Sequence, residues 1–240
     1  METYINTLSI ILGVFILLII IVWITIHKKR KRERELISSV TSLNKGTNSE
    51  LYLILQLLKR GIPPVTIYHD LLIKKENGEF SQIDLVLVTS EGIIVFEVKD
   101  FSGWIYGSGS NTNWTKVLSY GRKKYKFYNP IKQNNNHISE LRKTLKQFEN
   151  IPFFSVIVFF GDCELKEINY VPKGTYLVKG HRVFEVLDLI KNENEPTEYT
   201  NKREVVDKLK ELVSLGENVD YQKQHIENIK DMVGKDRILK

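Results

Sequence analysis

The stretch QIDLVLVTSEGIIVFEVK, residues 82–99, decides the fold of this chain. Residues 83–88 and 93–98 are nearly continuous apolar runs rich in β-branched side chains, and Ser90, Glu91 and Gly92 interrupt them. This pattern predicts two strands joined by a tight turn. Because both runs are apolar on both faces, we expect them in a sheet that is covered on both sides.

Three charged residues break the apolar pattern: Asp84, Glu97 and Lys99. Glu97 and Lys99 are two residues apart in one strand, so they point to the same face. If the loop consists of Ser90 and Glu91 alone, Asp84 falls directly opposite Glu97, with Cβ atoms about 5 Å apart. A three-residue loop would shift the register by one residue and separate the two carboxylates.

Two carboxylates this close favour a divalent cation, because burying like charges is costly unless something neutralises them. Mg²⁺ prefers one or two carboxylates together with water and phosphate oxygens. We therefore expect Asp84 and Glu97 to hold Mg²⁺ or Mn²⁺, and Lys99 to assist water in phosphodiester hydrolysis. The alternative is that all three are solvated residues near strand ends.

The residues around this pair resemble a known family. Asp84 followed by Glu97-Val98-Lys99 resembles the PD-(D/E)xK nuclease superfamily, although Ile83 stands where the superfamily name has proline. The continuation EVKDFSGWIYGS, then Asn113-Trp114 and YNPIKQNNNH, is similar to the nuclease-related domain, NERD, from about residue 46 to at least residue 160. The resemblance implies a restriction-endonuclease-like α/β fold, a mixed central sheet flanked by helices, and a nuclease acting on DNA.

The resemblance adds Glu50 to the candidate site. Residues 47–60 predict a helix that stops before Gly61 and Pro63-Pro64. Related nucleases often place an acidic residue from a first helix near the metal, and Gly46 with Glu50 matches that start. The alternative is a capping box, because Thr47-x-x-Glu50 has the required spacing.

Gln133 is the fifth candidate site residue. Asn129-Pro130 predicts the start of a helix that runs to about residue 148. Gln133 matches the N-P-x-x-Q stretch of the family, which implies that its amide helps shape the active site by binding a metal-bound water or a phosphate oxygen. The alternative is a solvated surface glutamine.

The N-terminus predicts a membrane anchor. Residues 8–26 are apolar except for Ser9, Gly13 and Thr25, long enough for about 30 Å of hydrocarbon. Glu2 precedes this run and HKKRKR, residues 27–32, follows it. The positive-inside rule then predicts a single-pass helix in the cell membrane, with the N-terminus outside, the domain in the cytosol and the basic cluster against anionic lipid.

The whole chain divides into five predicted segments: an outer N-terminus (1–6), a transmembrane helix (7–27), a basic stalk (28–45), the NERD core (46–165) and a C-terminal strand with covering helices (166–240). Further strands are expected at residues 65–73, 153–160 and 175–178. Helices are expected at residues 183–190, 202–215 and 219–232. Trp104, Tyr106 and Trp114 favour the tip of a smaller hairpin, as a satellite core or, with the lysines interleaved there, a nucleic-acid contact.

Composition narrows the function classes. The formal net charge is +6, but residues 28–35 alone carry +4, so the domain is only mildly basic. The single cysteine, Cys163, excludes an internal disulfide framework and a cysteine-based zinc site. The leading hypothesis is a membrane-anchored, metal-dependent nuclease. The alternatives are an inactive nuclease fold that binds nucleic acid or a protein partner at the membrane, and a membrane scaffold.

Overall fold

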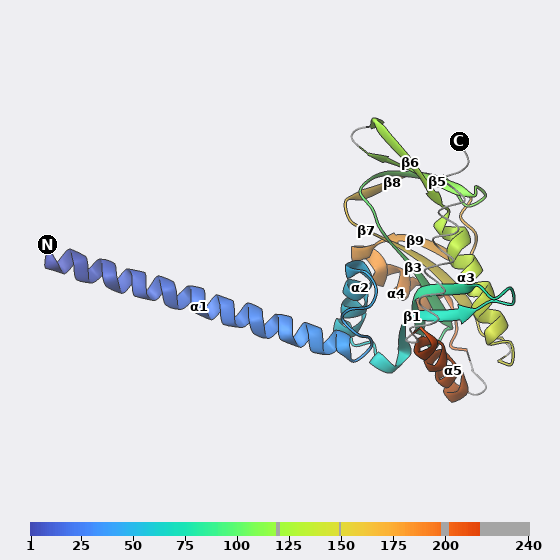
Figure 1. Cartoon of the computed structure of the whole chain (residues 1–240), viewed down its shortest axis with the longest axis horizontal. Coiled ribbons are helices and arrows are strands. Elements are labelled where there is room, and N and C mark those ends of the chain that lie inside the picture. Colours follow the sequence, from blue (N-terminus) through green and yellow to red (C-terminus); the bar gives the residue numbers. More distant parts are fainter. Residues whose placement is uncertain (119–120, 149, 198–201, 217–240) are drawn as a thin grey trace.

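The computed structural model describes residues 1–118, 121–148, 150–197 and 202–216, without side chains for residues 2–11 and 202. A long helix, α1 (Glu2–Ser38), projects from a folded α/β body (Figure 1). Within Leu12–Ser38 an 18-residue window has a mean hydropathy of 2.0, so the helix is long and apolar enough to cross a membrane, criteria that a signal sequence also meets. The basic residues 28–35, at the start of the predicted stalk, continue this helix.

The central sheet is mixed, as expected. Its order is β1-β2-β3-β7-β9, with the first three strands antiparallel and the last two parallel to β3. The strands are β1 (Ile67–Lys74), β2 (Phe80–Val88), β3 (Ile93–Asp100), β7 (Phe153–Phe160) and β9 (Thr175–Lys179). The three-strand meander predicted from the apolar runs is therefore confirmed. A short 3-10 turn, η1 (Pro64–Thr66), replaces the first two residues of the predicted first strand.

Helices cover both faces of this sheet. One face packs against α2 (Asn48–Lys59) and α4 (Val183–Glu193), and the other against α3 (Pro130–Thr144) and α5 (Lys202–Leu215). The two apolar clusters explain why residues 83–88 and 93–98 are hydrophobic on both faces. A second 3-10 turn, η3 (Gly180–Arg182), precedes α4. The helix expected at residues 219–232 lies outside the described residues.

A second sheet lies beside the central one, and the sequence pattern did not predict it. Its order is β6-β5-β4-β8, with strands β4 (Gly103–Ser108), β5 (Asn113–Leu118), β6 (Lys123–Tyr128) and β8 (Cys163–Asn169). The expected small hairpin is present as the antiparallel pair β4–β5. Trp104, Tyr106 and Trp114 lie within its strands, so their predicted place at its tip was wrong. Trp114 is buried and stacks on Phe159 of the central sheet, with ring centroids 6.5 Å apart.

The turn between β2 and β3 has the two-residue form. Val88 pairs with Ile93, and the Thr89 amide donates to the Gly92 carbonyl at 2.9 Å. This register is the one that brings the two predicted metal ligands together.

Candidate active site

The site lies where β2 and β3 separate, a point we call the fork. The antiparallel ladder ends at the pair Leu85 and Phe96. One step further, the same register brings Asp84 opposite Glu97. Beyond this point β3 continues to pair with β7, while β2 continues with β1 alone. The register thus places Asp84 and Glu97 at facing positions of the two strands.

The fork is also an irregularity in β2. Ile83 packs in the apolar cluster under α3 and α5, whereas Leu85 packs in the cluster under α2 and α4. Residues two apart in a regular strand share a face, so the alternation breaks at Asp84. The partner position in β1 is Asp70, which the ladder skips and which has a φ of 59°. Positive φ in a residue other than glycine is strained backbone that is often found at functional sites.

Where the backbone pairing of β2 with β3 has ended, the Asp84 side chain forms a hydrogen bond to the backbone of β3. Its Oδ2 accepts a hydrogen bond from the Val98 amide at 2.7 Å, and Oδ1 accepts none from the described residues. Burial raises the pKa of Asp84 well above its usual value, and the negative charges of Glu97 and Glu50 raise it further. Burial thus disfavours the ionised form of this carboxyl group, and a bound cation would favour it.

Glu97 is fully buried, and neither of its carboxylate oxygens has a hydrogen bond among the described residues. Oε1 forms an ion-pair contact with Lys99, and Oε2 lies 3.4 Å from His137 Nε2. Buried carboxylates normally have regular hydrogen-bond partners. Glu97 therefore retains lone pairs that a further cation can bind.

Lys99 and Gln133 meet at the fork. Lys99 Nζ donates to Gln133 Oε1 at 3.2 Å and contacts Glu97. Gln133 lies near the start of α3, where the Asn129 side chain accepts hydrogen bonds from the Ile131 and Lys132 amides. The predicted helix start is confirmed, although the helix ends at Thr144 rather than near residue 148.

His137 is a site residue that the sequence analysis did not assign. It follows Gln133 by four residues, which places both side chains on one face of α3. Its Nδ1 lies 2.7 Å from Ser81 Oγ, and its Nε2 faces Glu97. The i, i+4 spacing from Gln133 was the available signal, but nothing in the sequence links His137 to Glu97.

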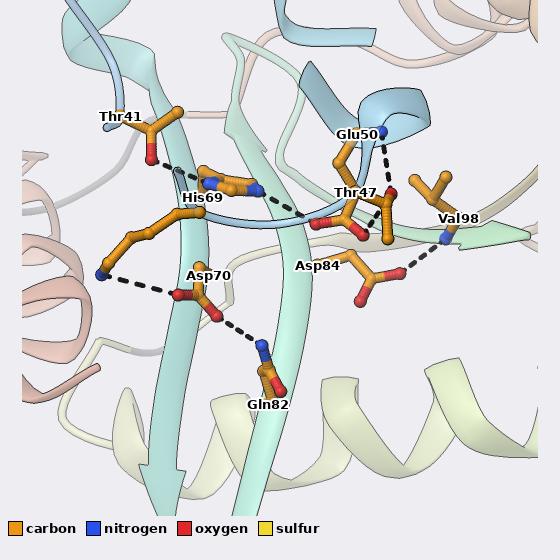
Figure 2. Close-up of polar contacts among 9 residues, drawn as sticks. Thr41, Thr47, Glu50, His69, Asp70, Gln82, Asp84 and Val98 are labelled. Atoms are coloured by element: carbon orange, nitrogen blue, oxygen red, sulfur yellow. Dashed lines mark hydrogen bonds and ion pairs between the residues drawn. The ribbon is translucent and has the colours of Figure 1, made fainter. Parts of the chain in front are cut away.

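Glu50 forms a second acidic corner at the start of α2 (Figure 2). Its Oε1 accepts the Thr47 hydroxyl at 2.7 Å and its Oε2 lies 3.0 Å from His69 Nε2. Burial alone would raise the pKa of Glu50, but the hydrogen bonds from His69 and Thr47 lower it below its usual value. The Thr47 hydroxyl also accepts the Glu50 amide, so the capping interaction expected as the alternative is present.

His69 and Gly46 hold this corner in place. His69 is buried and contacts Thr41 Oγ1 through Nδ1 at 2.9 Å, so it bridges the segment after α1 to Glu50. Gly46 has a φ of +71°, and a Cβ there would lie 2.5 Å from both Glu50 Oε2 and His69 Nε2. Only glycine fits that position. His69 is the second residue that the sequence analysis left out.

The donor set at the fork fits a divalent cation with few protein ligands. Within the described residues no group of three or more His, Cys, Asp or Glu side chains forms a metal cluster. Mg²⁺ needs only one or two carboxylates when water and phosphate oxygens complete its shell. The oxygens of Glu97, which have ion-pair contacts but no hydrogen bonds, and Oδ1 of Asp84 meet that requirement.

Comparisons with known proteins agree with the motifs. The chain is 33% identical over 112 residues to an uncharacterized protein of Bacillus anthracis, and the alignment covers 47% of this chain and 51% of that protein. The chain therefore matches about half the length of that relative. No solved structure matches the chain. Residues 45–160, which contain all five predicted site residues, match the family described as the Nuclease-related domain, NERD.

Proposed function

We propose that this chain belongs to the NERD family and is a membrane-anchored nuclease that hydrolyses phosphodiester bonds in DNA on the cytosolic side, using Mg²⁺ or Mn²⁺. The observation that carries the proposal is the fully buried Glu97, whose two oxygens lack hydrogen bonds, opposite Asp84 and beside Lys99. The NERD match supports a nuclease-related activity.

Asp84 and Glu97 would hold the cation at the fork. A divalent ion there supplies a Lewis acid for the phosphate and lowers the pKa of a bound water. The raised pKa of Asp84 fits this role, because a nearby cation would restore its ionised form. Two facing buried carboxylates repel each other, so without a cation they are unfavourable for stability.

Lys99 would act on the substrate rather than on the cation. Its ammonium group can orient the attacking water or stabilise negative charge on the phosphate. Gln133 positions Lys99 because its Oε1 accepts a hydrogen bond from Lys99 Nζ at 3.2 Å. Both oxygens of Glu50 already contact Thr47 or His69, so its role would be electrostatic. Its negative charge raises the pKa of Asp84, and a bound cation would offset that effect.

Cleavage by the full-length chain in detergent tests the proposal. Plasmid, linear DNA and RNA are incubated with Mg²⁺, Mn²⁺ or EDTA, and we expect metal-dependent cleavage that Glu97→Gln removes. Glu185→Gln is the matched control, because Glu185 is an exposed residue of α4 that pairs with Arg182. Cleavage that persists in Glu97→Gln, or in EDTA, would refute the assignment.

The membrane placement has its own test. Residues 1–6 would lie outside, residues 7–27 would span the bilayer, and residues 28–45 would contact anionic lipid before the core (46–165) and the C-terminal part (166–240) in the cytosol. Lys210 is exposed on α5, whereas the native Cys163 is buried. We expect Lys210→Cys to resist an impermeant thiol reagent in intact cells and to react after lysis. Labelling in intact cells would show that the domain lies outside and so contradict the predicted topology.

One observation favours an inactive fold that binds nucleic acid or a protein partner. Lys99 and His137 both contact Glu97, so cationic side chains can offset its charge without a metal. Calorimetric titration with Mg²⁺ and Mn²⁺ separates the two functions. The nuclease requires binding that Asp84→Asn weakens, whereas the inactive fold predicts no divalent binding at all.

A further inference from the structure

The positive charge of the folded body is concentrated in one stretch. The chain has 35 basic and 29 acidic residues, and residues 101–139 contain six of the basic residues and none of the acidic ones. The rest of the chain is therefore neutral overall. Among the described residues none of these six side chains forms an ion pair. They are Lys116, Arg122, Lys123, Lys124, Lys126 and Lys132.

Strand β6 carries most of this charge and is open to solvent. It is an edge strand of the second sheet, and its lysines are exposed. Tyr125 and Tyr128 in the same strand are 48% and 43% exposed. An edge strand with three lysines and two exposed tyrosines in six residues contributes little to an apolar core, so packing does not explain its composition.

The outer face of the second sheet combines the lysines with aromatic side chains. The inner face packs on the central sheet through Ile105 and Trp114. On the outer face the register forms two rows across three strands, each with a half-buried aromatic residue on β4 and an exposed lysine on β6. In each row the aromatic residue and the lysine lie two strand spacings apart, which is about 10 Å. The rows are Trp104–Val117–Lys124 and Tyr106–Thr115–Lys126.

We propose that this outer face of β4, β5 and β6 binds single-stranded nucleic acid. Lys124 and Lys126 contact phosphates, and Trp104, Tyr106 and Tyr128 stack on bases. Aromatic platforms beside a basic strand suit single strands, because only unpaired bases expose their faces for stacking. The inference rests on the proposed function in one respect: the strand bound here is the substrate that the fork cleaves.

The outer face is connected directly to the candidate active site. β6 ends one residue before Asn129, whose buried side chain caps α3 and also donates to the Ser108 and Asn111 carbonyls. Asn136 on α3 donates to the Tyr128 hydroxyl at 3.4 Å. Gln133, which accepts a hydrogen bond from Lys99 at the fork, lies on the same helix. A nucleic acid held on β6 is therefore bound by the element that leads to the fork.

An anionic membrane surface has similar chemistry, but the arrangement favours nucleic acid. Figure 1 shows the β5–β6 hairpin at the top of the folded body, to the side of the axis of α1 and apart from its junction with the body. The aromatic side chains beside the lysines supply stacking surfaces, which suit unpaired bases. The basic residues 28–35, which continue α1, are already placed for lipid contact.

Binding by the full-length chain in nanodiscs of neutral phosphatidylcholine tests the proposal, with EDTA present so that metal-dependent cleavage does not occur. Fluorescence anisotropy with a short labelled DNA strand and its duplex gives the affinities across a salt series. The variants are Lys124→Gln with Lys126→Gln, and Tyr128→Ala. The matched control is Lys74→Gln with Lys191→Gln, two exposed lysines outside residues 101–139.

The double lysine variant should bind the single strand at least ten-fold more weakly, and the slope of log K against log salt should fall by about 1.4. Tyr128→Ala should weaken single-strand binding about ten-fold and duplex binding far less. The control should bind like the wild type. Melting curves for each variant show whether the fold is intact.

Three results would overturn the proposal. Both variants could keep wild-type affinity, or Tyr128→Ala could weaken duplex and single strand equally. In a parallel assay with phosphatidylserine vesicles, the lysine variant could lose binding to the vesicles and keep its affinity for the single strand, which would assign the face to lipid. Because EDTA is present throughout, these failures leave the nuclease function standing. If the chain binds single strands but never cleaves them, the proposed nuclease activity is refuted and the proposed binding surface stands.

Discussion

Glu50 and Glu97 are both buried carboxylates near the fork, yet the protein treats them in opposite ways. Each oxygen of Glu50 has a hydrogen-bond partner, Thr47 or His69, and its pKa is lowered. Neither oxygen of Glu97 has one, and its charge helps to raise the pKa of Asp84. The folded chain alone thus stabilises the ionised form of Glu50, whereas Asp84 and Glu97 require something further.

Cleavage should show the largest contrast between the two corners. Glu97→Gln and Asp84→Asn remove a charge that the cation needs, so we expect cleavage to fall on the order of 10³-fold and metal affinity to weaken. Glu50→Gln should cost only about ten-fold, because Glu50 acts through the pKa of Asp84. Cleavage rates and calorimetric metal titrations measure both effects. Equal losses in Glu50→Gln and Glu97→Gln would contradict the contrast.

Lys99 should affect cleavage without supporting metal binding. Lys99→Met keeps the length of the side chain and removes its charge, so cleavage should fall about 10²-fold. Metal affinity should be unchanged or modestly higher, because an ammonium group that repels the cation is gone. The same titration and cleavage assay measure both values. Cleavage at the wild-type rate would make Lys99 a structural partner of Glu97 only.

Stability in EDTA should change in opposite directions at the two corners. Glu97→Gln removes the repulsion between Glu97 and Asp84 and leaves Lys99 its hydrogen bond to Gln133, so the melting temperature should stay constant or rise. Glu50→Gln disrupts two satisfied contacts and should cost about 1–3 kcal/mol, or a few degrees in melting temperature. Thermal melts by circular dichroism compare the two variants. A larger loss in Glu97→Gln would show that its contacts with Lys99 and His137 stabilise the fold.

The pH dependence of stability should distinguish Asp84 from Glu50. The folded pKa of Asp84 is raised, so its ionisation destabilises the metal-free protein as the pH rises above the unfolded value of about 3.8. The stability gained by Asp84→Asn should therefore grow with pH. The pKa of Glu50 is lowered, so its contribution is present above about 4.5 and is lost as the pH falls through the folded value. Denaturant unfolding of each variant across this pH range measures both trends, and a gain for Asp84→Asn that does not change with pH would contradict the first.

Gln133 should give the smallest effect. Gln133→Leu removes the acceptor that positions Lys99 at 3.2 Å but leaves the charge of Lys99 in place. We expect cleavage to fall about ten-fold, with metal affinity unchanged, because a hydrogen bond to a charged group contributes about 1.5 kcal/mol at the low end of its range, which corresponds to about ten-fold in rate. Single-turnover cleavage measures this. A loss as large as that of Lys99→Met would assign Gln133 a direct contact with the substrate.

The sequence by itself determined the local parts of the site. Apolar runs of the right length predicted β2 and β3, and two residues between Thr89 and Gly92 set their register. Helix signals at Thr47 and Asn129 fixed where α2 and α3 begin, and therefore where Glu50 and Gln133 lie. Each of these features depends on residues a few positions apart, which short-range rules describe well.

Only the tertiary structure decided which partners each acid has. Ser81 and His137 are 56 residues apart, Asp84 and Val98 are 14 apart, and Glu50 and His69 are 19 apart. The second sheet likewise depends on β8 pairing with β4 across about 60 residues of chain. No local pattern encodes such contacts, because they form only when α2, α3 and the strands pack together. Packing is therefore what gives both oxygens of Glu50 a hydrogen-bond partner and leaves those of Glu97 without one.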